Sequence, residues 1–204
     1  TSAGCSCCTQ CPAPSRTDAT IDWTKVHLYF VDERAVPESH ERSNYRMIAA
    51  ALVDRAKIPA AQVHRMRGEG ADLAAVAKEY ENVVRMKTRA RGEQTPIFDL
   101  VVLGVGDDGH TASLFPHDAA VREHTRLVVP VAAKGDREAR LTITAPLIEA
   151  AHAVVVMALG KAKHAPLERI WAVNGDVDET PARVIRGARG SITWVIDRAA
   201  GGME

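Results

Sequence analysis

The stretch from Gly104 to Pro116, which reads GVGDDGHTASLFP, has the residue types needed for acid–base chemistry. His110 carries an imidazole, the side chain whose ordinary pKa lies nearest to neutral pH. Asp108, two residues earlier, can accept a proton from one ring nitrogen and leave the other free as a general base on water. Gly106 and Gly109 let the backbone turn tightly and approach a ligand closely. We therefore expect Asp108 and His110 to be catalytic and the two glycines to contact substrate.

The residues that follow His110 are expected to begin a helix, with Thr111 and Ser113 in its first turn. The amide groups at a helix N-terminus favour negative charge. A lone histidine is more often structural than catalytic. Here, however, glycine, aspartate and histidine gather directly after an apolar run, and this grouping favours a functional site.

Two further segments could bind an anion. Asp32-Glu33-Arg34 follows the apolar run VHLYFV, and the Arg34 guanidinium can grip a phosphate or carboxylate with two hydrogen bonds. Taken alone, this triplet is better explained as a surface turn before a helix capped by Ser43. Lys161 and Lys163 follow another apolar run, and lysine at a helix start conflicts with the helix dipole unless an anion shares the site. Solvated surface lysines explain the same pattern equally well.

The elements that must position these residues form an α/β pattern. Short apolar runs alternate with helical patterns, which predicts one open, mostly parallel sheet with helices on both faces, a doubly wound, Rossmann-like arrangement. Ligands bind at the carboxyl ends of strands in such sheets. Strands are expected in 26–31, 99–103, 153–159 and 191–196, an edge strand in 141–144, and helices after Ser43, over 71–91 and from Pro146.

The composition limits the remaining possibilities. The 204 residues carry 26 basic and 26 acidic side chains, so the excess of basic charge that general nucleic-acid or membrane binding needs is absent. No apolar run approaches the roughly 18 residues of a membrane span. We expect a single domain over residues 21–204, without nucleic-acid or membrane partners. Absence of cysteine from Pro12 onward suits the reducing cytoplasm, where we expect the protein to be located.

The first 20 residues contain all four cysteines, Cys5, Cys7, Cys8 and Cys11. Four thiolates can bind zinc, but zinc sites usually pair two well-separated ligand loops, and these four lie close together. We interpret residues 1–20 as a disordered or non-native leader and expect no metal site.

The three candidate segments, in this order, resemble the 6-phosphogluconolactonase family within the glucosamine-6-phosphate isomerase/6-phosphogluconolactonase superfamily. The resemblance runs from about Ile21 to Ala200. Related glucosamine-6-phosphate deaminases look like DGHIAFNEP where this chain reads DGHTASLFP, so this segment sides with the lactonases. The matching pieces are VDERAVP, PIFDLVVLGVGDDGHTASLFP, ARLTIT, GKAK, TPARVI and SITWVIDRAA.

The resemblance implies hydrolysis of 6-phospho-D-glucono-1,5-lactone to 6-phosphogluconate, a step of the oxidative pentose phosphate pathway, without a metal or an organic cofactor. It implies that His110 activates water and that Asp108 orients His110. Arg34 and Lys163 would bind the phosphate or stabilise developing negative charge. Asp32 is a weaker candidate for the polar site.

The N-terminus departs from the family, and two other functions remain open. Family members carry a strand, a helix and a Gly-Gly-Ser-Thr-Pro-like phosphate loop before the Asp22-Trp23 segment, and Thr1–Thr20 contains no such loop. We therefore expect this strand–helix unit to be missing from the sheet. The alternatives are an amino-sugar-phosphate isomerase or deaminase and a non-catalytic sugar-phosphate-binding domain.

Overall fold

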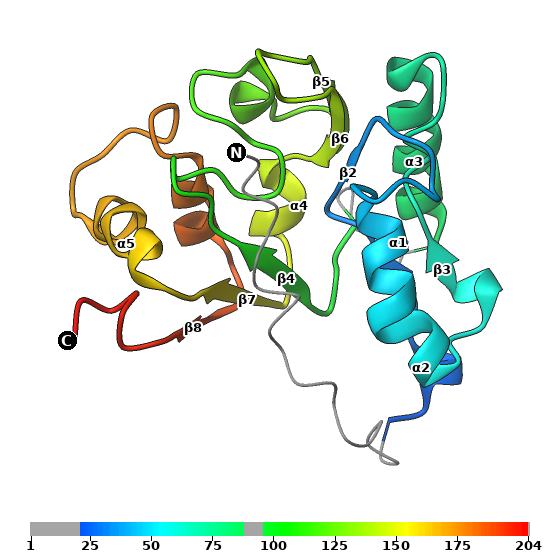
Figure 1. Cartoon of the computed structure of the whole chain (residues 1–204), viewed down its shortest axis with the longest axis horizontal. Coiled ribbons are helices and arrows are strands. Elements are labelled where there is room, and N and C mark those ends of the chain that lie inside the picture. Colours follow the sequence, from blue (N-terminus) through cyan, green and yellow to red (C-terminus); the bar gives the residue numbers. More distant parts are fainter. Residues whose placement is uncertain (1–20, 88–95, 204) are drawn as a thin grey trace.

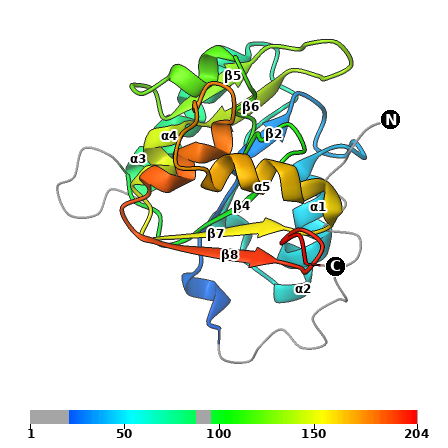
Figure 2. The same ribbon diagram turned by 90° about the vertical axis from the view of Figure 1, so that its left-hand side faces the viewer.

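The computed structural model describes residues 21–87 and 96–203, so the predicted leader lies outside the described residues. The predicted α/β class is confirmed. Strands β4 (Val101–Gly104), β7 (Ala153–Ala158) and β8 (Ser191–Ile196) form a parallel sheet in the order β4-β7-β8. Helices α4 (Ala145–Glu149) and α5 (His164–Trp171) lie on one side of it (Figures 1 and 2).

The two faces of this sheet differ in burial. Val101 and Leu103 of β4, and Val154 and Val156 of β7, point into the hydrophobic core and are at most 3% exposed. Alternate side chains on the opposite face are more open, and Val102 is 49% exposed. The continuous apolar runs predict burial on both faces; among the described residues, only one face is packed against the core.

A second sheet is antiparallel and joins distant parts of the chain. It contains β2 (Asp32–Arg34), β6 (Arg140–Ile143) and β5 (Val128–Val131) in the order β2-β6-β5. The Asp-Glu-Arg triplet is thus itself a strand rather than a turn after one. The predicted edge position of residues 141–144 is wrong, because β6 pairs with a strand on each side. Helix α3 (Leu73–Lys87) packs against β5 and β6.

The N-terminal part contains a short parallel pair and a composite helix. Strands β1 (Leu28–Tyr29) and β3 (Val63–His64) pair with each other. The predicted cap is confirmed, since Ser43 Oγ accepts a hydrogen bond from the Arg46 amide (3.2 Å). From this cap run α1 (Asn44–Ile48), a π-helical turn (Ala49–Val53) and α2 (Asp54–Ala56). Within residues 21–87 and 96–203, the 3-10 turns are Trp23–Lys25, Ala60–Gln62, Ala119–Arg122, Lys161–Lys163 and Pro181–Gly187.

None of the helices within the described ranges is long and apolar enough to cross a membrane.

Candidate active site

A tight loop after β4 brings Asp108 and His110 together. The Gly106 amide donates to the His110 carbonyl (2.8 Å), and the Gly109 amide donates to the Gly106 carbonyl (3.0 Å). Inside this turn, Asp108 Oδ1 accepts a hydrogen bond from the His110 amide (3.0 Å) and lies 2.6 Å from His110 Nδ1. The loop therefore forms the predicted carboxylate–imidazole pair from residues that are close in sequence.

Both predicted glycines are required by the turn. A Cβ on Gly106 would lie 2.1 Å from His110 Nδ1, so any larger residue would displace the imidazole. Gly109 has φ +90°, a conformation that L side chains rarely adopt, and a Cβ there would lie 3.0 Å from Thr180. Contact of these glycines with substrate stays a prediction.

The carboxylate form of Asp108 is stabilised by its neighbour. Burial raises the pKa of this carboxyl, but hydrogen bonds from the His110 ring and amide, together with the attraction of the ring, outweigh that effect and leave the pKa below its usual value. An ionised Asp108 holds a proton on Nδ1 and leaves Nε2 as the nitrogen available to water or substrate. His110 is thus oriented as a general base requires.

The predicted helix at Thr111 and Ser113 is wrong, since Thr111 and Leu114 form an isolated antiparallel bridge instead. Both hydroxyls are fully buried and bind within the protein. Thr111 Oγ1 donates to the Gly104 carbonyl (2.9 Å), and Ser113 Oγ donates to Asp32 Oδ2 (2.7 Å). These bonds fix the segment after His110 as a turn.

Phe115 connects His110 to two arginines that the sequence reasoning did not select. Its ring centroid lies 4.5 Å from that of His110, and the guanidinium carbons of Arg137 and Arg140 lie 3.7 and 5.7 Å from the Phe115 centroid. The motif ARLTIT contains Arg140, and the hydrogen bond from the Ser113 amide to Thr142 Oγ1 (3.1 Å) joins this strand to the segment of Phe115. A close approach across strands leaves no local signal in the sequence.

These arginines retain unused hydrogen-bonding capacity. The Nε atoms of Arg137 and Arg140 are buried and have no partner among the described residues. Burial is the main cause of a lowered pKa for Arg140; nearby Asp32 opposes this shift, and nearby Arg34 adds to it. Buried polar groups are usually hydrogen-bonded, so two donors without a partner on arginines that contact Phe115 suit an anionic ligand.

The predicted cation Arg34 belongs to the same region. Arg34 is paired in register with Arg140, and its Nη1 donates to the Arg42 carbonyl (2.6 Å). The Asp32 carboxylate, two residues before Arg34, binds other side chains of the protein. Asp32 accepts from Ser113 and from Asn44 Nδ2 (3.0 Å) and lies 3.7 Å from Arg140, so it joins the loop of His110 to the arginines.

Lys163 contacts the same loop at Asp107. It ends the 3-10 turn before α5, and its Nζ lies 2.6 Å from Asp107 Oδ1, three residues before His110. Gly160, with φ +91°, makes the turn out of β7 possible. Lys163 thus contacts the loop of His110 at Asp107, whereas Arg137 and Arg140 reach it through Phe115.

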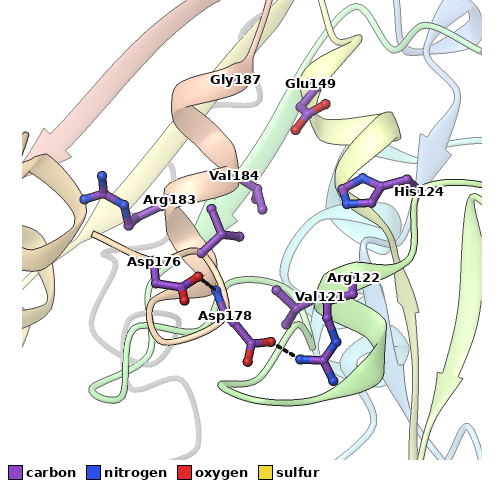
Figure 3. Close-up of a pocket in the computed structure, with 10 residues that line it drawn as sticks. Val121, Arg122, His124, Glu149, Asp176, Asp178, Arg183, Val184 and Gly187 are labelled. Carbon is purple, nitrogen blue, oxygen red and sulfur yellow. Dashed lines mark hydrogen bonds and ion pairs between the residues drawn. The ribbon is translucent and has the colours of Figure 1, made fainter. Parts of the chain in front are cut away.

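A separate cavity of about 540 Å³ does not contain these residues. Figure 3 shows that it lies between the turn at Arg122, the end of α4 at Glu149 and the 3-10 segment that carries Val184. Asp178 pairs there with Arg122. Since none of the predicted site residues lines it, the chemistry is assigned to the loop of His110 rather than to this hollow.

Comparison with known proteins gives a consistent result. The model of the family described as glucosamine-6-phosphate isomerases/6-phosphogluconolactonase matches residues 7–194. The chain is 40% identical to a 6-phosphogluconolactonase of Synechocystis, over 89% of this chain and 74% of that protein. It is 34% identical to the human 6-phosphogluconolactonase, over 92% and 70%. The crystal structure of 6-phosphogluconolactonase from Leishmania guyanensis superimposes with a TM-score of 0.74 at 30% identity, covering 85% and 72%.

The loop of His110, the cations beside it and these similarities all lead to the same assignment: the chain belongs to the glucosamine-6-phosphate isomerase/6-phosphogluconolactonase family.

Proposed function

We propose that the chain hydrolyses 6-phospho-D-glucono-1,5-lactone to 6-phosphogluconate in the oxidative pentose phosphate pathway. Relatives that are 32–40% identical over most of the chain carry the name 6-phosphogluconolactonase, and they favour this reaction over amino-sugar-phosphate isomerisation or deamination. The observation that carries the proposal is the Asp108–His110 pair at 2.6 Å, in a loop that Lys163 contacts at Asp107 and Arg137 at Phe115. We place the reaction in the cytoplasm, as the distribution of cysteines suggests.

The reaction needs one base that later acts as an acid. His110 Nε2 takes a proton from water while the water oxygen attacks the lactone carbonyl carbon. Asp108 holds Nδ1–H and stabilises the imidazolium that forms. The bond from the carbonyl carbon to the ring oxygen then breaks, and the imidazolium returns its proton to that oxygen. The products are a hydroxyl and a carboxylic acid, so all atoms of water are retained in 6-phosphogluconate.

Different cations interact with the two negatively charged parts of the substrate, the phosphate and the carbonyl oxygen. Arg34 and Lys163 bind the phosphate. Arg140, with its buried Nε, strengthens the positive field in which the carbonyl oxygen gains charge. Asp32 positions Arg140 and Ser113 and does not itself react.

The experiment is turnover of the phosphorylated lactone by the purified chain, corrected for spontaneous hydrolysis. His110→Ala is expected to lower the rate by about 10²–10⁴-fold, the usual contribution of a general base. His117→Ala is a matched control, because His117 also pairs with an aspartate, Asp178 (3.2 Å), outside the proposed site. Ammonia release from glucosamine 6-phosphate, without lactone turnover, would replace this function with the deaminase reaction.

A further inference from the structure

The residue immediately before Asp108 has a contact that the proposed mechanism does not use. Asp107 Oδ1 lies 2.6 Å from Lys163 Nζ, and the Asp107 carbonyl accepts a hydrogen bond from Arg169 Nη2 (3.3 Å). Asp107 belongs to the loop of His110, whereas Lys163 ends the 3-10 turn before α5 and Arg169 lies within α5. The Lys163 ammonium group, to which we assign the substrate phosphate, is therefore already paired with the Asp107 carboxylate.

The two partners differ in their access to water. The Lys163 side chain is 20% exposed and the Asp107 side chain is 57% exposed. A largely desolvated ammonium needs an anionic partner, because burial of an unpaired charge is costly. An exposed carboxylate loses little when it returns to water, since ion pairs at the surface contribute little stability. The asymmetry favours exchange of the anion while Lys163 stays in place.

The position of Lys163 also favours a negatively charged group beside it, whether a carboxylate or a phosphate. Lys163 directly precedes α5 and its own side chain does not cap the helix, whereas the Gly160 amide, at the start of the 3-10 turn, donates to the Asp197 carboxylate (3.0 Å). The helix dipole disfavours a lysine there unless negative charge lies beside it. The phosphate of a substrate meets the same requirement as the Asp107 carboxylate and carries more charge.

We propose that Asp107 is an exchangeable counter-ion that lowers the affinity of the site for phosphorylated ligands. The phosphate displaces the carboxylate from Lys163 when the substrate binds, and the carboxylate returns when the phosphorylated product leaves. Asp107 is then a specificity-determining residue that acts through Lys163, and its effect is confined to ligands with a phosphate. The inference rests on the proposed function, which places the phosphate at Lys163.

The test measures binding of 6-phosphogluconate and of unphosphorylated gluconate to the full chain by calorimetry. Asp107→Asn removes the charge and keeps an oxygen that Lys163 can contact. It is expected to tighten binding of 6-phosphogluconate about two- to fivefold, the range of an exposed ion pair, and to leave gluconate binding unchanged. The KM for the phosphorylated lactone is expected to fall by a similar factor, while kcat does not rise.

Three variants distinguish the role of Asp107 as a counter-ion from other roles of this residue. Asp107→Glu keeps the charge and should behave like the parent. Glu79→Gln removes an exposed acid whose partner is Arg67 and controls for net charge. In a Lys163→Met background, Asp107→Asn should have no further effect, because the coupling between the two residues is lost.

Weaker binding of 6-phosphogluconate by Asp107→Asn would overturn the proposal, since Asp107 would then only orient Lys163. Equal tightening for gluconate would also overturn it. A parent chain that binds 6-phosphogluconate without hydrolysing the lactone would contradict the proposed reaction, while the binding comparison would still decide the role of Asp107.

Discussion

At the scale of single residues, two cations, Arg34 and Lys163, are assigned to one phosphate. Arg34→Ala and Lys163→Ala are each expected to lower kcat/KM for the phosphorylated lactone by about 10- to 150-fold, since a hydrogen bond to a charged group contributes roughly 1.5–3 kcal/mol. The rate with plain gluconolactone should change far less. Parallel assays on both substrates check this. Equal losses on both would place these residues at the lactone end or in folding.

The sequence predicted part of this site for a physical reason. Asp108 and His110 are two residues apart, so their pairing is local, and glycines on either side allow the turn. Arg137 and Arg140 are distant from Phe115 in the sequence, and the Ser113 amide joins the two segments by donating to Thr142 Oγ1 of β6 (3.1 Å), a contact that no local pattern encodes. The residues that depend on long-range pairing were therefore the ones missed.

At the scale of elements, Glu33 fixes the start of α1. It is 2% exposed, and its carboxylate accepts hydrogen bonds from the amides of Asn44 and Tyr45 (both 2.8 Å) and from Ser43 Oγ (3.1 Å). Glu33→Ala is expected to cost about 3–5 kcal/mol of unfolding free energy, because these donors lose a buried charged partner.

Ser43→Ala is the comparison for Glu33: it removes the helix cap, worth about 1 kcal/mol, and one hydrogen bond to Glu33, but leaves the two bonds from the Asn44 and Tyr45 amides. Denaturant unfolding of both variants measures the difference. Similar costs for the two would mean that the cap, rather than the buried carboxylate, holds the helix.

The turn that leads into β5 depends on an ionised acid. Backbone hydrogen bonds from Arg126 and then Thr125 lower the pKa of Glu123 to about 2, from 4.5. Because the folded-state pKa is depressed, this stabilisation is present above about pH 4.5 and is lost as the pH falls through the window toward 2. Glu123→Gln should therefore lower stability at neutral pH by roughly 1 kcal/mol, and the difference from the parent should shrink in that window.

Chemical denaturation at a series of pH values tests the prediction for Glu123. Glu79→Gln is the control, because its ion pair with Arg67 is loose (3.8 Å) and exposed. A difference from the parent that stays constant down to pH 2 would mean that the charge of Glu123 does not stabilise the turn.

At the scale of the whole molecule, the sequence predicted the α/β class and the parallel strands, but it did not predict the antiparallel sheet. Long apolar runs identified β4, β7 and β8, although in the structure at most alternate residues of these strands are buried. The short strand β2 has the sequence Asp-Glu-Arg and carries no strand pattern. It forms because β6 lies beside it, so the antiparallel sheet could not be predicted from local propensity.

The unequal faces of the β4-β7-β8 sheet lead to the last prediction. Val156 is fully buried and pairs with Leu103, whereas Val102 is 49% exposed on the opposite face. Threonine has nearly the shape of valine, so Val156→Thr mainly buries a hydroxyl and should cost about 1–3 kcal/mol of unfolding free energy. Val102→Thr should stay within about 0.5 kcal/mol, as for other surface substitutions.

Denaturant unfolding at two protein concentrations separates the possible causes. If Val102→Thr costs as much as Val156→Thr, and the cost grows with protein concentration, the open face is covered by a second copy of the chain in solution. If the cost is as large but independent of concentration, the face is covered within one chain. A small cost at both concentrations is the expected result, because half of the Val102 side chain already contacts water and a hydroxyl there stays hydrated.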